Sequence, residues 1–237
     1  MSPIRSRETG NSGGSNAPRG DRDIPNYGER LRRARFGLAI GVATVSMLFV
    51  VFTATYVGRR LFDDDSPGVN STVAIRRSPW THLQLPISLL LFNSLLLLAS
   101  SATMEMARRQ VTKRAALAPL EGMPGVSLGH ERFLPWLQLT IVLGFGFVAG
   151  QAFAWRAMVA RGYYIATTPS STFVYLATIL HAVHVSAGLI ALLCAAGMAV
   201  LKSSWDARRI VVDISAWYWH FMGALWIYLF GLLVVMS

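Results

Sequence analysis

Three histidines and several tryptophans lie inside apolar segments near the C-terminus, where imidazole rings could ligate a metal or a haem. His181 and His184 are three residues apart, and His220 belongs to the run 216–221, which reads AWYWHF. Residues three apart share a helix face, so the first two rings could reach one ion. Polar side chains within a bilayer need partners, and these histidines therefore mark a chemical site or a protein contact surface.

A metal site built on these histidines is incomplete in the sequence. A third imidazole would have to come from His220, and we expect no Asp, Glu or Cys beside the three rings to complete a ligand set. A more specific alternative to a metal-ion site is a haem held between two helices by axial imidazoles. However, the three rings look too close together to sandwich a macrocycle, and His82 and His130 fall near span ends or in a loop. We favour hydrogen bonds across helix interfaces or to lipid headgroups.

The aromatic residues around His220 also have an explanation that involves no chemistry. Trp217, Tyr218 and Trp219 fit the belt of Trp and Tyr that anchors membrane helices at the bilayer interface. Trp226 and Tyr228 lie deeper in the same segment. We expect these two side chains to face a partner helix or acyl chains.

A carboxylate ends another apolar segment. Glu105 follows Ser100 and Ser101 by about one helical turn and precedes Arg108 and Arg109. This spacing predicts an ion pair at the membrane interface. The two serines are predicted helix contacts, because small and hydroxyl side chains let membrane helices approach closely.

Long apolar elements must position these residues. The chain has 237 residues, of which 53% are hydrophobic and 14% charged, a balance seldom found in soluble domains. Five stretches exceed the roughly 20 residues that cross a hydrocarbon core. The predicted fold is an all-α membrane protein, a bundle of five transmembrane helices. The expected spans are about 36–58, 80–104, 133–155, 171–201 and 214–236.

The basic residues are distributed unevenly between the two ends of these spans. Residues 1–34, rich in Ser, Gly, Asn and Arg, are predicted to be a disordered basic tail before the membrane domain of residues 35–237. With the tail inside, sixteen of the 22 Lys and Arg residues fall on one side. This positive-inside pattern predicts a cytoplasmic N-terminus and an external C-terminus. The net charge of +10 is then topological, and we expect no nucleic-acid partner.

Taken together, the segments resemble subunit III of the haem–copper oxidases, the family of cytochrome c and quinol oxidases. The motifs are AWYWHF at 216–221 followed by Trp226, HAVHVxxG at 181–188 with Ala182 in place of the family's glycine, and NSLLLLxSS at 93–101. The resemblance covers about residues 35–237. With Glu105, the motif residues are candidates for contact with lipid or another subunit: Asn93, Ser100, Ser101, Glu105, His181, His184, Gly188, Trp217, Tyr218, Trp219, His220, Phe221 and Trp226.

The resemblance implies the five-helix form of subunit III in a bacterial inner membrane. Such a subunit belongs to an oxidoreductase that reduces oxygen to water and pumps protons, yet carries no catalytic or metal-ligating residue of its own. Haem and copper are expected in the partner, subunit I, with subunit II in the same complex. The chain itself is expected to stabilise subunit I and to hold phospholipid.

Two departures from the family pattern stand out. Val45 and Gly223 occupy positions where many members carry a membrane-embedded carboxylate. Any role that depends on those acids is in doubt for this chain. Two alternatives stay open, namely an accessory subunit of a nitric oxide reductase and an autonomous haem-binding membrane protein.

Overall fold

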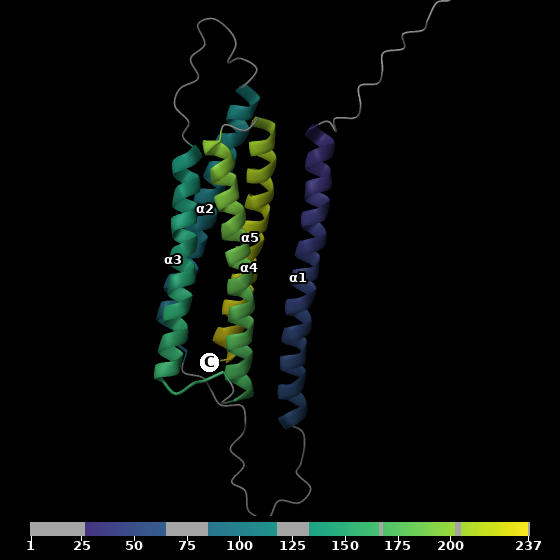
Figure 1. Cartoon of the computed structure of the whole chain (residues 1–237). Helices are drawn as coiled ribbons and strands as arrows, with labels where there is room; N and C mark the ends of the chain where they lie inside the picture. The colour runs from purple at the N-terminus through teal and green to yellow at the C-terminus, as the bar shows by residue number, and fades with distance from the viewer. Residues whose placement is uncertain (1–26, 65–84, 118–132, 166–167, 202–204, 237) are drawn as a thin grey trace, which may run out of the picture.

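The computed structural model describes residues 27–64, 85–117, 133–165, 168–201 and 205–236, and these fold as five long α-helices (Figure 1). No β-strand occurs in these ranges. The helices are α1 (Tyr27–Asp64), α2 (Ile87–Leu117), α3 (Phe133–Ala160), α4 (Pro169–Val200) and α5 (Trp205–Met236).

Each helix is long enough and apolar enough to cross a bilayer. The helices contain 28 to 38 residues, which at 1.5 Å per residue is about 42 to 57 Å. The hydrocarbon core is about 30 Å thick, so every helix extends beyond it. The predicted all-α bundle of five membrane helices is confirmed.

The helix ends differ from the expected spans. Helix α1 begins at Tyr27 and includes residues 27–34, which were assigned to the disordered tail, whereas the tail before residue 27 lies outside the described residues. Helix α2 continues past the expected end at 104 to Leu117, and α5 begins at Trp205 rather than near 214. Apolar composition marks only the part of a helix inside hydrocarbon. The backbone ladder continues into the headgroup region through charged residues that favour helix.

The start of α4 follows from local chemistry. Pro169 occupies the first helical position, where its fixed φ and missing N–H cost nothing. The hydroxyl of Thr168 accepts a hydrogen bond from the backbone N–H of Ser171 at 3.1 Å, which caps the helix. The Thr-Pro signal therefore predicts a helix start to within two residues.

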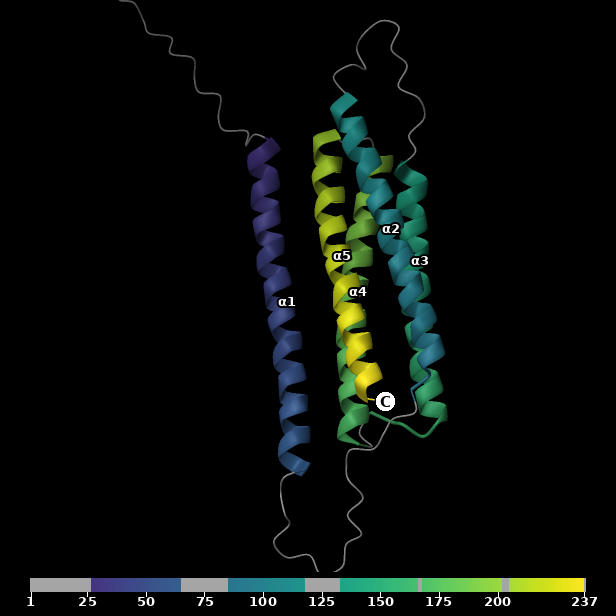
Figure 2. The same ribbon diagram turned by 180° about the vertical axis from the view of Figure 1, so that it is seen from behind.

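Four of the helices form one body, and the first stands to one side. In two opposite views α1 lies apart from α2 to α5 (Figures 1 and 2). Helix α2 packs against α3 and α5, and α4 packs against α3 and α5, while α1 makes its largest contact with α5. Helix α1 begins and α5 ends at opposite ends of the bundle (Figure 1).

The packed core lies among α2 to α5. The largest fully buried side chains there include Trp219, Trp226, Phe147, Leu97 and Met104. On α2 the buried positions recur every three or four residues, which places them on one face toward α3 and α5. The opposite face carries exposed Leu and Phe side chains, as expected for a surface in contact with lipid.

Candidate functional site

Helix α5 is joined to α2 through two buried tryptophans. The indole N–H of Trp219 donates to Ser100 Oγ at 3.1 Å, and the indole N–H of Trp226 donates to Ser94 Oγ at 2.9 Å. Both tryptophan side chains are fully buried. The Ser100 hydroxyl in turn donates to the backbone carbonyl of Thr140 on α3 at 3.1 Å. These bonds satisfy the polar atoms that membrane helices must pair internally.

Glycines on α3 and α4 make room for Trp219. A Cβ added to Gly144 would stand 2.7 Å from Leu189 Cδ2 and 2.9 Å from Trp219 Cη2. At Gly188 an added Cβ would approach the ring of Tyr218 at 3.0 Å and that of Trp219 at 3.2 Å. A side chain at Gly144 would force its neighbours to shift, and one at Gly188 would need the two rings to give by a few tenths of an ångström, so the glycines permit this close approach.

The AWYWHF run divides between the core and the surface. Trp219 is buried, whereas Trp217 is 53% exposed and Tyr218 and Phe221 are half-buried. The Tyr218 hydroxyl donates to the backbone carbonyl of His184 on α4 at 3.0 Å. The expected interfacial role fits Trp217, whereas Trp219 is a packing residue. Successive helix positions are about 100 degrees apart, so residues two positions apart point to nearly opposite sides of the helix.

The three histidines have different surroundings. His181 is fully buried against the rings of Phe147 and Trp226. The Nδ1 of His184 is bonded to the backbone carbonyl of Leu180 at 2.7 Å. Among the residues that the structure describes, no three His, Cys, Asp or Glu side chains lie close enough together to hold a metal ion.

His220 lies near an acidic side chain that the sequence analysis did not expect beside it. Its Nδ1 is 3.2 Å from Ser101 Oγ, and its Nε2 is 3.7 Å from Glu105 Oε2. Glu105 is thus an acidic neighbour of His220, but among the described residues this pair gains no third His, Cys, Asp or Glu to form a metal-ligand set. The two side chains meet because α2 and α5 pack against each other in antiparallel directions (Figure 2), and Glu105 and His220 both lie well inside their helices.

Glu105 forms the ion pairs that its spacing predicts. Arg108 Nη1 donates to Glu105 Oε2 at 3.1 Å, and Arg109 Nε donates to Glu105 Oε1 at 2.9 Å. Arg108 also reaches α5, where its Nε donates to Asp213 Oδ1 at 3.0 Å. Glu105 is thus part of a larger network that joins two helices.

Asp213 is the centre of this network, and the sequence analysis missed it. Besides the bond from Arg108, its Oδ2 accepts hydrogen bonds from Arg35 Nη2 at 2.8 Å and Nε at 3.1 Å. The side chain of Asp213 is only 12% exposed. A single carboxylate thereby connects α1, α2 and α5. Its position in an otherwise apolar run just before AWYWHF is a signal that could have revealed it.

An apolar groove separates α1 from α5 beside this network. Its volume is about 580 Å³, and its lining is almost entirely hydrocarbon apart from Arg35 and His220. The lining side chains are Leu38, Ala39 and Val42 from α1 and Trp217, Phe221 and Ala224 from α5, with Arg35 and His220.

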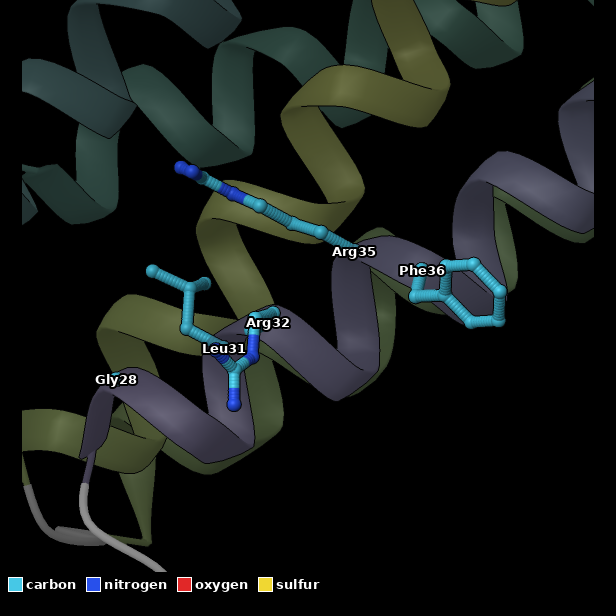
Figure 3. A pocket seen from close by; sticks show the side chains of 5 residues that line it. All are labelled: Gly28, Leu31, Arg32, Arg35 and Phe36. Atoms are coloured by element: carbon cyan, nitrogen blue, oxygen red, sulfur yellow. The ribbon is translucent and has the colours of Figure 1, made fainter.

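A second hollow of about 390 Å³ lies beside the first turns of α1. Figure 3 shows Gly28, Leu31, Arg32, Arg35 and Phe36 along it, with the Arg35 side chain extended toward α5. Arg35 lines both hollows. The two hollows thus share Arg35, and the second one also has Arg32 in its lining, whereas the rest of the groove is apolar apart from His220.

Aromatic contacts fasten α1 at its other end. The ring of Phe173 on α4 stacks on Tyr56 and Phe52, with centroid distances of 4.1 and 4.9 Å. Phe49 meets the ring of His184 edge-on at 6.1 Å. Helix α1 is thus held by the Asp213 ion pair near its start and by aromatic rings farther along, with the groove between.

These features define a multi-pass membrane protein in which the buried rings of Trp219, Trp226 and His181 pack between helices, while Trp217 and His220 border the groove beside α1. Residues 30–236 match the family model for cytochrome c oxidase subunit III. The chain belongs to that family, as its motifs indicated.

Named relatives agree with this assignment. The probable cytochrome c oxidase subunit 3 of Mycobacterium tuberculosis is 38% identical over 98 residues, which are 40% of this chain and 47% of the relative. The subunit 3 of Corynebacterium diphtheriae is 29% identical over 150 residues, 63% and 65% of the two chains. The subunit 3 of Locusta migratoria is 26% identical over 200 residues, 83% and 66%. The chain spans about half the length of the mycobacterial relatives it matches. With five apolar helices and bacterial relatives, it is a protein of the bacterial inner membrane.

Proposed function

We propose that this chain is a non-catalytic subunit III of a terminal haem–copper oxidase, which reduces oxygen to water and pumps protons. The observation that carries the proposal is the family match over residues 30–236. It is supported by the use of Trp219 and Trp226 in packing rather than in a reaction centre. Haem and copper belong to the partner, subunit I, and subunit II completes the complex. The work of this chain is to stabilise subunit I and to hold phospholipid.

The groove between α1 and α5 is the proposed phospholipid site. Its volume of about 580 Å³ falls within the roughly 300 to 1,000 Å³ of ligand-sized pockets. A transmembrane helix about 10 Å across and 30 Å long would need several times that volume. The apolar lining suits an acyl chain, and the arginines at the end of the groove suit a phosphate headgroup.

The orientation of the chain belongs to the same proposal. Arg32 and Arg35 lie at the end of the bundle from which α1 starts, on the side that carries most of the basic residues. A cytoplasmic N-terminus places the proposed headgroup site in the inner leaflet. Reporter domains fused before Met1 and after Ser237 test this orientation. A reporter that is active only in the cytoplasm should be active before Met1, and one that is active only outside the cytoplasm should be active after Ser237.

The experiment for the oxidase role is purification of the tagged full chain from its own membrane in mild detergent. A co-purifying catalytic subunit with haem and copper spectra and oxygen-reducing activity supports the proposal. Recovery with a nitric oxide reductase, or a Soret band in the chain freed of partners, contradicts it.

The lipid site is tested by the phospholipid content of the same preparation. Arg32→Gln should lower the bound anionic phospholipid, because Arg32 lines the hollow at the groove end. Arg33→Gln is the matched control, since it removes the same charge one residue along the helix outside both linings. Equal loss in both variants would mean that only net charge attracts lipid, and the groove would not be its site.

A further inference from the structure

His181 is a buried polar side chain without a hydrogen-bond partner. Its ring has no exposure. Neither Nδ1 nor Nε2 has a partner within the part of the chain that the structure describes. A neutral imidazole has one N–H donor and one acceptor nitrogen. Leaving such groups unpaired in hydrocarbon is costly, and buried polar groups are almost always bonded to protein or to an ordered water.

The helix seam beside His181 contains a second polar side chain. Trp155 on α3 donates to Thr178 on α4 at 3.0 Å, and Phe147 on α3 meets the His181 ring edge-on at 5.9 Å. Gln151 stands one turn from each of these α3 residues. It therefore lies on α3 at the level between Thr178 and His181.

Gln151 has hydrogen-bonding capacity to spare. It is buried, and its one side-chain bond among the described residues uses its carbonyl oxygen, which accepts from Asn93 Nδ2 at a long 3.4 Å. The amide N–H groups remain for another partner.

Asn93 itself does not offer the same opportunity. Its Oδ1 also has no partner, but it presses against the backbone of Gly150, where an added Cβ would overlap it. His181 and Gln151 belong to the two helices of the α3–α4 seam, whereas the unpaired Oδ1 of Asn93 comes from α2.

We propose that the α3–α4 seam holds an ordered water that bridges a ring nitrogen of His181 and the side-chain amide of Gln151. A water molecule can accept from the amide N–H of Gln151 and donate to the unprotonated ring nitrogen of His181, so one molecule pairs the amide and one of the two ring nitrogens. The site lies inside the helix bundle, on the far side of α4 from α1, and it is independent of the proposed lipid groove. The inference does not rest on the oxidase role.

The test is solid-state NMR of the full chain in lipid bilayers, with ¹⁵N-labelled histidine and tryptophan and magnetisation transferred from water protons. The His181 ring should receive water magnetisation quickly. The indole N–H of Trp226 is the internal control, because it is equally buried but bonded to Ser94. Transfer to His181 as slow as transfer to Trp226 overturns the proposal, and this comparison needs no variant.

Two substitutions extend the test. Gln151→Leu should abolish the fast transfer to His181 and leave Trp226 unchanged; persistence of the transfer would show that Gln151 is not the bridge. His181→Phe should lower the thermal midpoint, and Gln151→Leu should add no further loss in the double variant. A higher midpoint for His181→Phe would mean that the ring was unpartnered, and additive losses would mean that no water joins the two side chains.

Discussion

Helices α2 to α5 are held together by contacts along their whole length, whereas α1 is attached at two places. In the four-helix body, buried tryptophans bond to serines across the α2–α5 seam and glycines bring α3 and α4 against the same indole. Helix α1 is joined by the Arg35–Asp213 pair near its start and by rings stacked on Phe173 farther along. Only 6% of its apolar stretch is buried, against 33 to 39% in the other four.

The difference follows from the bilayer as a solvent. Lipid tails are as apolar as leucine, so apolar side chains alone give membrane helices little reason to associate. The attraction between membrane helices comes instead from close approach at small residues and from hydrogen bonds between helices, and α2 to α5 have both. The middle of α1 has neither, which leaves room for the groove between Arg35 and the aromatic contacts.

The largest effect should come from removing the central packing residue of the four-helix body. Trp219→Ala deletes a fully buried indole and should destabilise the chain by about 3 to 5 kcal/mol. Trp217→Ala is the matched control, because its side chain is 53% exposed. Reversible unfolding in mixed micelles measures both. Equal losses for the two would mean that the comparison between core and lipid-facing positions is wrong.

A smaller effect is expected where two helices touch through a glycine. Gly144→Ala introduces a Cβ into contact distances of 2.7 and 2.9 Å, and overpacking of this kind costs about 1 to 3 kcal/mol. Gly231→Ala on α5 has open space around it and should be neutral or gain a fraction of the roughly 1 kcal/mol that alanine favours in helices. The same assay compares the free energies of unfolding of the two variants. No loss for Gly144→Ala would show that the side chains around Gly144 can shift without cost.

The third effect concerns the attachment of α1. Asp213→Asn removes the charge that Arg35 and Arg108 share and should cost about 1 to 3 kcal/mol. The lower part of that range applies, because the Arg35 side chain is 49% exposed and solvent screens it. Glu105→Gln is the control, since none of its partners Arg108, Arg109 and His220 belongs to α1 and the Arg35–Asp213 pair stays intact.

The separation of α1 from α5 shows whether the lost stability of Asp213→Asn comes from detachment of α1 or from loosening of the whole bundle. Spin labels at Leu38 and Ala224, on opposite walls of the groove, report the separation of α1 and α5. The distance distribution should broaden in Asp213→Asn and remain narrow in Glu105→Gln. An unchanged distribution in Asp213→Asn would show that the aromatic contacts alone position α1.

The sequence predicts the fold well because the number of membrane helices depends on composition. Five apolar stretches longer than the hydrocarbon thickness leave few architectures, and the Thr-Pro signal locates the start of α4. The helix ends are harder, because α2 continues through Glu105 and Arg109 to Leu117 while its hydropathy falls.

The pairing of side chains could not be predicted in the same way. Ser100 and Trp219 are recognisable as contact residues from their types, but their bond depends on how α2 and α5 are rotated about their axes. Asp213 was overlooked because its partner Arg35 is 178 residues away in the chain. A buried carboxylate in an apolar helix nevertheless requires a cation nearby, and that rule could have led to it.

The smallest effect should come from His220, which lies at the boundary between the two regions. It borders the groove, its side chain is 36% exposed, and its bond to Ser101 is 3.2 Å long. His220→Ala should therefore change the free energy of unfolding by less than about 1 kcal/mol, in the same assay that reports Trp219→Ala. Because Arg35 remains at the end of the groove, the anionic phospholipid bound per chain should also stay nearly constant. A loss as large as that of Trp219→Ala would place His220 inside the packed body. A loss of lipid at unchanged stability would instead make the imidazole part of the headgroup site, so the two measurements together locate the boundary between the bundle and α1.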